Sequence, residues 1–127
     1  MGLQHVAMPY PGGASADAAA RRFYGAALGL TELEPPASLV GSVLWFAAGD
    51  AEIHVFVEPS GVAVNDESRR HPCLRIEALR PFRLRLTGLG VETIDSDADI
   101  PGRERFFARD PFGNVLEFVH LATTIAP

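Results

Sequence analysis

The sequence predicts an α+β fold built from two similar halves. Its 127 residues suffice for one domain, and 47% hydrophobic against 21% charged residues is typical of a globular protein with its own core. The same patterns occur twice in the same order: a short strand, a helix, then two or three strands. A polar, turn-rich segment over residues 59–70 is typical of a linker. We therefore expect one domain over residues 1–127, with an internal duplication of about fifty residues that gives modules over about 1–58 and 71–121.

The first half begins with a short strand predicted over residues 3–8. A helix should follow, because Ser15 is a suitable N-cap for the alanine-rich segment after it. Two further strands are predicted over 42–48 and 51–58, on either side of a tight turn at Gly49. The apolar stripe of the helix, spaced to face the core, comprises Phe23, Ala26, Ala27 and Leu30.

The second half repeats this order. A strand is predicted over residues 71–77, and Pro81 suits the first turn of a second helix. Glycines at the end of the apolar pattern, Gly88 or Gly90, should end that helix. The last two strands form a predicted hairpin, over residues 104–109 and 114–120.

Composition excludes several classes of function. The net charge is −5 and no basic run occurs, so nucleic acid and anionic membranes are not expected partners. No apolar run approaches the roughly 18 residues of a membrane helix, and the first residues lack the pattern of a signal peptide. A single cysteine, Cys73, excludes an intrachain disulfide and fits a reducing compartment, so we expect a cytoplasmic protein. The absence of lysine excludes Schiff-base chemistry and a Walker-type phosphate loop.

Four residues with metal-binding side chains occupy equivalent places in the two halves. His5 and His71 lie in the first strand of each half, while His54 and Glu117 lie 49 and 46 residues later, in the last strand of each half. Strand alternation places His54 and Glu117 on the face opposite the aliphatic residues. Three imidazoles and one carboxylate would bind a divalent ion such as Zn, Ni, Co, Mn or Fe, and the cation would make a buried Glu117 tolerable.

Each of these residues also has a simpler interpretation. A single histidine in a strand is more often a hydrogen-bonded core residue than a ligand. A single buried glutamate is more often paired with an arginine, and Arg75, Arg103 or Arg105 could be that partner. Four such residues at duplicated positions favour the metal site, with His54 having the weakest support.

Several motifs together resemble the vicinal oxygen chelate superfamily, which includes glyoxalase I, fosfomycin-resistance and bleomycin-resistance proteins, and extradiol dioxygenases. The motifs are "HVAM", "RFYGAALGL", "EIHVF", "RHPCLRIE" and "RDPFGNVLEF". The resemblance implies two βαβββ modules that form an open, barrel-like cleft around a divalent metal. Its ligand positions fall on His5, His54, His71 and Glu117. Relatives of this size form homodimers, so two sites shared between subunits are implied.

The number of ligands bears on the expected reaction. Four protein ligands leave two positions on a six-coordinate ion, which suits Lewis-acid chemistry on a small substrate with neighbouring oxygens. We therefore expect a glyoxalase-like lyase or isomerase, with Glu117 as ligand and candidate base. A ring-cleaving dioxygenase uses two histidines and one carboxylate, so that alternative applies if His54 points away. The other alternative is a metal-independent protein that sequesters a small molecule or antibiotic, as bleomycin-resistance proteins do.

Five further side chains are weaker candidates for contacting a substrate. Trp45 and Phe56 would line the cleft wall, although core packing explains them equally well. Arg75 could hold a substrate carboxylate or form a structural ion pair, and Arg105 could face the cleft mouth or solvent. Cys73 lies on the same strand face as His71. We nevertheless expect it to be a small core residue, since nothing obvious would lower the pKa of its thiol.

Overall fold

A computed structural model describes residues 1–58 and 68–122 of the chain, so most of the predicted linker lies outside the described residues. The chain divides into two compact units, and each is described here by itself. Within the described residues, the first unit contains residues 1–58 and 111–114, and the second contains 68–110 and 115–122. No helix in this part of the chain is long and apolar enough to cross a membrane.

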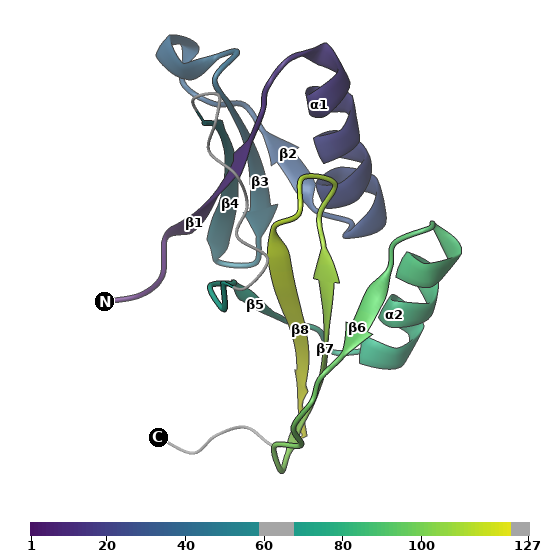
Figure 1. The fold of residues 1–127 in the computed structure, drawn as a ribbon. Helices are drawn as coiled ribbons and strands as arrows, with labels where there is room; N and C mark the ends of the chain where they lie inside the picture. The colour runs from purple at the N-terminus through teal and green to yellow at the C-terminus, as the bar shows by residue number, and fades with distance from the viewer. Residues whose placement is uncertain (59–67, 123–127) are drawn as a thin grey trace. The chain divides into compact units, whose positions relative to one another are not determined.

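The first unit is a four-stranded sheet with one long helical segment and one short helix (Figure 1). In chain order its elements are β1 (His5–Tyr10), α1 (Ala14–Ala20), the π-helix η1 (Arg21–Ala27), β2 (Thr31–Leu33), the short 3-10 helix η2 (Ala37–Leu39), β3 (Val43–Ala48) and β4 (Ala51–Val57). The strand order is β1-β4-β3-β2, with β1 parallel to β4 and the other pairs antiparallel.

The second unit repeats the topology of the first. Its strand order is β5-β8-β7-β6, again with one parallel pair, β5 and β8, and two antiparallel pairs. Each unit is therefore a βαβββ module, which confirms the predicted α+β fold. The elements are β5 (Cys73–Arg75), α2 (Leu79–Gly88), β6 (Thr93–Asp95), β7 (Arg103–Arg109) and β8 (Val115–Leu121).

The first helix differs from the prediction in its start and in its hydrogen bonding. It begins at Ala14 after Gly13, and no side chain caps it, so the prediction that Ser15 is the N-cap was wrong. Its second half is a π-helix, in which the N–H of Leu28 donates to the carbonyl of Phe23, five residues earlier. A π-helix has more residues per turn than an α-helix, so the buried stripe changes phase. Ala26 of the predicted stripe is consequently exposed, and Leu28 is buried instead.

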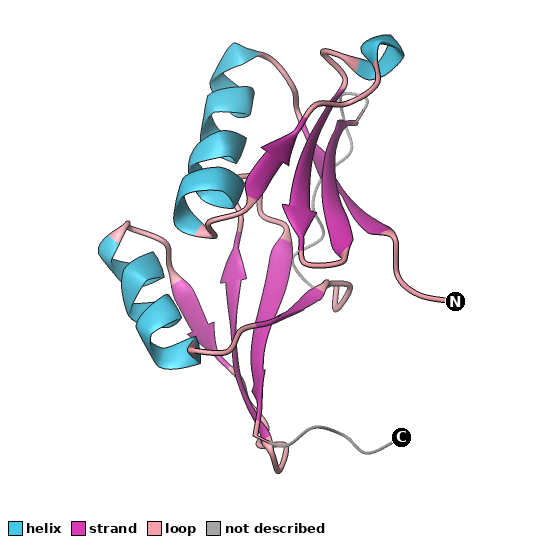
Figure 2. Cartoon of the chain, turned by 180° about the vertical axis from the view of Figure 1, so that it is seen from behind, coloured by secondary structure: helices cyan, strands magenta, loops and turns pink. Residues whose placement is uncertain are grey.

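One face of each sheet is covered by its helix, as the reverse view shows (Figure 2). In the first unit, Tyr24 of η1 stacks on Phe46 of β3, with ring centroids 5.4 Å apart. In the second unit, the ring of Phe82 on α2 lies 5.1 Å from that of Phe118 on β8. The residues of β4 and β8 that alternate with the buried ones lie on the opposite, helix-free faces. Those faces carry His54 and Glu117.

Candidate functional site

The strand register confirms that the two halves present their polar residues at equivalent positions. His54 on β4 pairs across the parallel ladder with Ala7, and Glu117 on β8 pairs in the same way with Cys73. His5 lies two residues before Ala7, and His71 lies two residues before Cys73. Residues two apart in an extended chain share a face, so His5 lies on the face of His54 and His71 lies on the face of Glu117.

In the second unit, His71 and Glu117 point toward one another. Nε2 of His71 lies 3.3 Å from Oε1 of Glu117. The other ring nitrogen, Nδ1, lies 2.7 Å from the backbone carbonyl of Arg69. A carbonyl only accepts, so Nδ1 must carry the proton, and Nε2 presents either a second proton or a lone pair to the carboxylate. A metal-binding histidine commonly donates from one ring nitrogen to a backbone carbonyl and binds the ion through the other nitrogen.

Arg105 is the arginine that pairs with Glu117. Its Nη1 lies 3.1 Å from Oε1 of Glu117, and both side chains are only 13% exposed. Its Nη2 donates to the carbonyl of Ala98 at 3.1 Å, and its guanidinium carbon lies 5.6 Å from the centre of the Phe107 ring. The simpler interpretation of a buried glutamate, an arginine partner, therefore describes this contact.

Cys73 is the third side chain in contact with Glu117. Its thiol donates to Oε2 at 2.9 Å, and the residue is exposed, so the expectation of a small core residue was wrong. Partial burial of the sulfur, followed by the hydrogen bond to Glu117, raises the pKa of Cys73 to about 12. Because the thiol stays protonated at neutral pH, Cys73 is not an activated nucleophile.

The carboxyl group of Glu117 is ionised in this setting. Burial acts to raise its pKa, but the hydrogen bonds from Cys73 and Arg105 and the charges of Arg105 and His71 outweigh burial and hold the pKa below its ordinary value. Glu117 is therefore an anion beside the cationic guanidinium of Arg105. That state suits a ligand for a cation.

In the first unit, three rings form a stack on the helix-free face of the sheet. The ring of His54 lies between those of Trp45 and His5, with centroid distances of 4.2 and 4.1 Å. The edge of the same imidazole is also held, because its Nε2 lies 2.8 Å from Oε1 of Glu52. Hydrogen bonds from His54 and then Gln4 hold the pKa of Glu52 below its ordinary value.

Sequence reasoning did not single out Glu52 as part of this site. The signal was present, since Glu52 precedes His54 by two residues and alternation places both on one face.

The stack restricts how the first unit can bind an ion. A metal lies close to the plane of each imidazole that ligates it, because the nitrogen lone pair lies in that plane. The rings of His5 and His54 are nearly parallel, at 15°, and lie one above the other. As placed, they cannot both bind the same ion. Across the described ranges, no group of three or more His, Cys, Asp or Glu side chains is arranged to hold a metal.

The remaining candidates are placed less distinctively. Trp45 stacks on His54, and its Nε1 is buried without a hydrogen-bond partner among the described residues. Phe56 lies partly exposed on the same strand face as His54, and Arg75 is exposed at the end of β5. A role of these three residues in binding a substrate stays a prediction.

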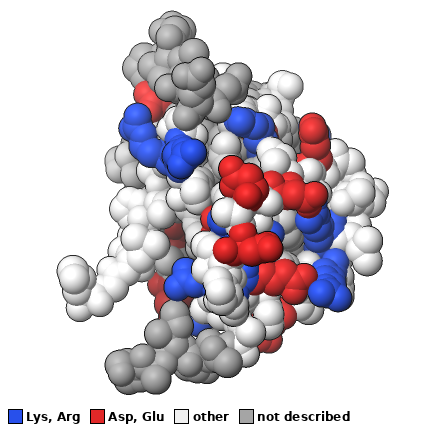
Figure 3. All heavy atoms as spheres, turned by 60° about the horizontal axis from the view of Figure 1, so that its bottom comes forward, with Lys and Arg blue, Asp and Glu red and all other residues white. Residues whose placement is uncertain are grey.

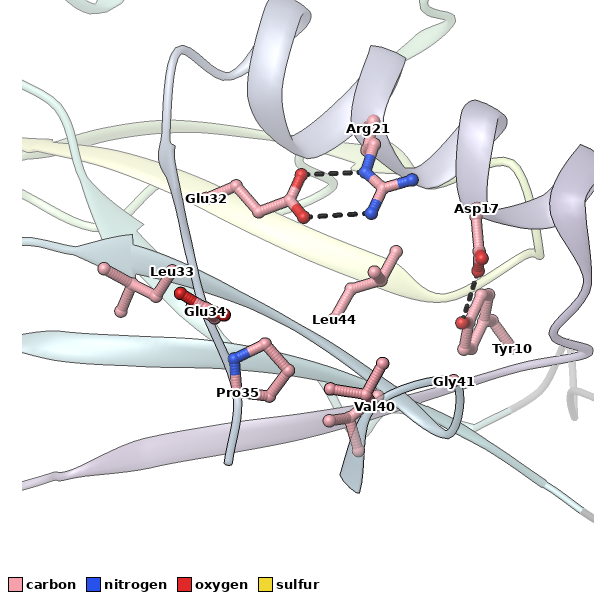
Figure 4. A pocket seen from close by; sticks show the side chains of 11 residues that line it. Tyr10, Asp17, Arg21, Glu32, Leu33, Glu34, Pro35, Val40, Gly41 and Leu44 are labelled. Carbon is pink, nitrogen blue, oxygen red and sulfur yellow. Dashed lines mark hydrogen bonds and ion pairs between the residues drawn. The ribbon is translucent and has the colours of Figure 1, made fainter. Parts of the chain in front are cut away.

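A separate pocket lies on the helix side of the first unit (Figure 4). It has a volume of about 540 Å³, and none of the predicted site residues lines it. Its polar side chains are largely paired with one another. Arg21 forms two hydrogen bonds to Glu32, at 2.8 and 3.1 Å, and the hydroxyl of Tyr10 donates to Asp17 at 2.6 Å. This pocket is distinct from the face that carries His54.

On the face of the molecule drawn in Figure 3, acidic and basic side chains lie interspersed, without a broad basic patch. Ion pairs of this kind in the second unit join Arg80 to Glu104 at 3.0 Å and Arg83 to Asp95 at 2.6 Å.

The chain matches no family model, and no curated protein matches it. Solved structures do match. A protein from Bacillus anthracis, described as a glyoxalase family protein, shares 34% identity over 95% of both chains, with a TM-score of 0.84. A glyoxalase/dioxygenase from Nostoc punctiforme shares 23% identity over 94% of this chain and 90% of that one, with a TM-score of 0.76. An antibiotic-binding protein from Streptomyces sp. CB03234 shares 20% identity over 95% and 96%, with a TM-score of 0.70. With a relative this similar over nearly its whole length, the chain belongs to the glyoxalase family of the vicinal oxygen chelate superfamily.

Proposed function

We propose that the protein is a metal-dependent enzyme of the glyoxalase type, acting as a lyase or isomerase on a small substrate with neighbouring oxygen atoms. The observation that carries the proposal is the pair formed by His71 and Glu117. An imidazole Nε2 and a carboxylate Oε1 lie 3.3 Å apart, and a backbone carbonyl fixes the far side of the ring. Two metal-binding atoms already oriented toward one point need little rearrangement to bind a cation.

The proposed ligands are His71 and Glu117 from one module and His5 and His54 from the other. When bound, a divalent ion polarises oxygen atoms of the substrate as a Lewis acid. Glu117 supplies the negative charge among these ligands and is the candidate base. To join the set, His54 must release Glu52, and one ring of the stack must turn, because parallel rings cannot share an ion.

An extradiol-type dioxygenase is the second candidate, and a specific observation favours it. The ring of His54 is held by Glu52 at its edge and by Trp45 on its face. If His54 keeps these contacts, the remaining ligands are His5, His71 and Glu117. Two histidines and one carboxylate leave three positions on a six-coordinate iron, enough for a catechol and dioxygen.

The related structures include both enzymes and a binding protein, so the first question is whether this protein binds a metal. The relative from Nostoc is a glyoxalase/dioxygenase, whereas the one from Streptomyces binds an antibiotic. The same fold therefore serves proteins with different tasks, and fold alone does not choose among them. Metal content separates the enzymes proposed here from a metal-independent binding protein.

The first test is elemental analysis of protein purified without chelator, with two matched variants. Glu117→Gln removes the buried carboxylate, and Glu104→Gln removes an exposed one from the neighbouring strand of the same unit. We expect bound metal in the wild type and in Glu104→Gln, and loss of most of it in Glu117→Gln.

A wild type without metal, and without thermal stabilisation by Ni, Zn, Co, Mn or Fe, would refute the enzyme proposal. That result would favour a binding protein of the bleomycin-resistance type. For metal-loaded protein, turnover of hemithioacetals or other aldehyde derivatives supports the lyase or isomerase. Cleavage of catechols by the iron form supports the dioxygenase.

A further inference from the structure

Arg105 pairs with Glu117 at the position where a bound metal ion would be expected. Its side chain, like that of Glu117, is only 13% exposed, so the two charges neutralise one another away from most of the solvent. Buried ions are tolerated when they are paired, and the guanidinium supplies the pairing without any metal. The carboxylate is thus already compensated by a residue of its own chain.

The arginine and the histidine use the same carboxylate oxygen. Nη1 of Arg105 lies 3.1 Å from Oε1 of Glu117, and Nε2 of His71 lies 3.3 Å from that same atom. The other oxygen, Oε2, accepts the thiol hydrogen of Cys73. A divalent ion held between His71 and Glu117 would need Oε1, and it would also lie close to a positively charged guanidinium, which repels it.

The guanidinium is held by few other contacts. Apart from Glu117, it donates to the carbonyl of Ala98. Its Nε is buried and has no hydrogen-bond partner among the described residues. Five N–H groups with two acceptors among the described residues leave Arg105 incompletely satisfied where it lies. Moving it away from Glu117 breaks one ion pair, together with the hydrogen bond to Ala98 and the contact with the Phe107 ring.

We propose that Arg105 is an internal competitor for the metal, which neutralises Glu117 in the metal-free protein and must leave Oε1 before a divalent ion binds there. The proposal rests on the metal function proposed above. It assigns Arg105 the task of setting the affinity: the stronger the arginine pair, the weaker the apparent binding of the ion. The same pair keeps the metal-free module neutral at this point and therefore folded.

The experiment measures Co²⁺ binding by isothermal titration calorimetry on the full chain after removal of metal. Arg105→Met removes the charge but keeps an apolar stem beside Phe107. Arg103→Met is the matched control, because Arg103 lies on the same strand, is exposed, and does not contact Glu117. We expect Arg105→Met to bind Co²⁺ about tenfold more tightly than the wild type or more, the range expected for a hydrogen bond between charged groups. Arg103→Met should remain within about twofold of the wild type, since exposed charges contribute little.

Thermal unfolding of the same proteins gives a second readout. Metal-free Arg105→Met should unfold at a lower temperature than the wild type, because Glu117 loses its partner, and Co²⁺ should raise its melting temperature by more than it raises that of the wild type. If Arg105→Met does not fold, Arg105→Lys replaces it, since an ammonium offers a weaker contact than the guanidinium. The expectation is then a severalfold gain in affinity.

If the wild type binds Co²⁺ and the folded Arg105 variant binds it equally or more weakly, the proposed competition is overturned. The proposed metal function is not affected by that result. If neither the wild type nor any variant binds Co²⁺, both proposals fall together. A gain in Arg103→Met equal to that in Arg105→Met would also overturn the competition, because the effect would then be one of general charge.

Discussion

Replacing Glu117 by glutamine tests the electrostatics of the second unit without any metal. The side chain keeps its size and its ability to accept hydrogen bonds, but it loses the charge that pairs with Arg105 at 3.1 Å. Breaking a buried ion pair from one side costs about 3–5 kcal/mol, and the retained amide acceptor recovers part of this loss. We therefore expect Glu117→Gln to lower the free energy of unfolding at pH 7 by about 2–3 kcal/mol.

The matched control is Glu104→Gln on the neighbouring strand β7. Glu104 pairs with Arg80 at 3.0 Å, but these side chains are 51% and 83% exposed. Exposed ion pairs contribute roughly 0–1 kcal/mol, so this variant should be close to the wild type. Both variants change the same chemical group in the same unit. The difference between their free energies of unfolding therefore isolates the effect of burial.

The assay is urea denaturation followed by circular dichroism with EDTA present. With a slope of about 1.5 kcal/mol per molar urea, Glu117→Gln should lower the midpoint by about 1.3–2 M. Since the folded protein holds the pKa of Glu117 below its ordinary value of 4.5, the carboxylate stabilises the fold above that pH and stops doing so as pH falls through the folded pKa. The gap between wild type and variant should therefore narrow below about pH 4.5. Equal midpoints at pH 7, or a gap that stays constant into acid, would refute this account of Glu117.

Three further predictions concern the thiol, the ligands and the assembly. Cys73 is exposed, but with a pKa of about 12 only on the order of one thiol in ten thousand is ionised at pH 8. Iodoacetamide should therefore alkylate Cys73 far more slowly than it alkylates glutathione. Rapid alkylation of Cys73 would contradict the hydrogen bond between its thiol and Glu117. His71→Ala should lose most of the bound metal, whereas His54→Ala should lose less, as elemental analysis will show; the reverse order would exclude the ligand set proposed here. If sites are shared within a homodimer, mixing His5→Ala with Glu117→Ala under subunit exchange should restore roughly a quarter of the metal sites, and confirmed exchange without recovery would place each site within one chain.

Much of the fold was predictable because period-two alternation is strong in the two long last strands. The pattern around Ile53 and Val55 correctly predicted a buried face, and so did the pattern around Leu116 and Phe118. The three-residue strands β2 and β6 were missed, since so short a segment contains too few alternations to recognise. The π-helix was missed because a shift of hydrogen bonding by one residue leaves no mark in composition.

The positions of the candidate residues were predictable, but their contacts were not. Duplicated spacing predicted that His5 lies near His54 and His71 near Glu117, and each pair is in contact. The cross-strand register decides which arginine contacts Glu117. Phe107 lies opposite Glu117, and Arg105 lies two residues from Phe107 on the same strand face. Three arginines were open to sequence reasoning, and only the register distinguishes them. The side-chain rotation that stacks His54 on Trp45 has no sequence signal at all.

The chain contains a single tryptophan, and the stack places its indole face to face with the imidazole of His54, at an angle of 7°. Light emitted by an indole is quenched when an electron-poor ring lies against it, and an imidazole becomes electron-poor when it gains a proton or binds a cation. We expect the emission of this protein to respond when a cation binds His54, undiluted by any other tryptophan. Cation binding can then be observed with this optical probe in unlabelled wild-type protein.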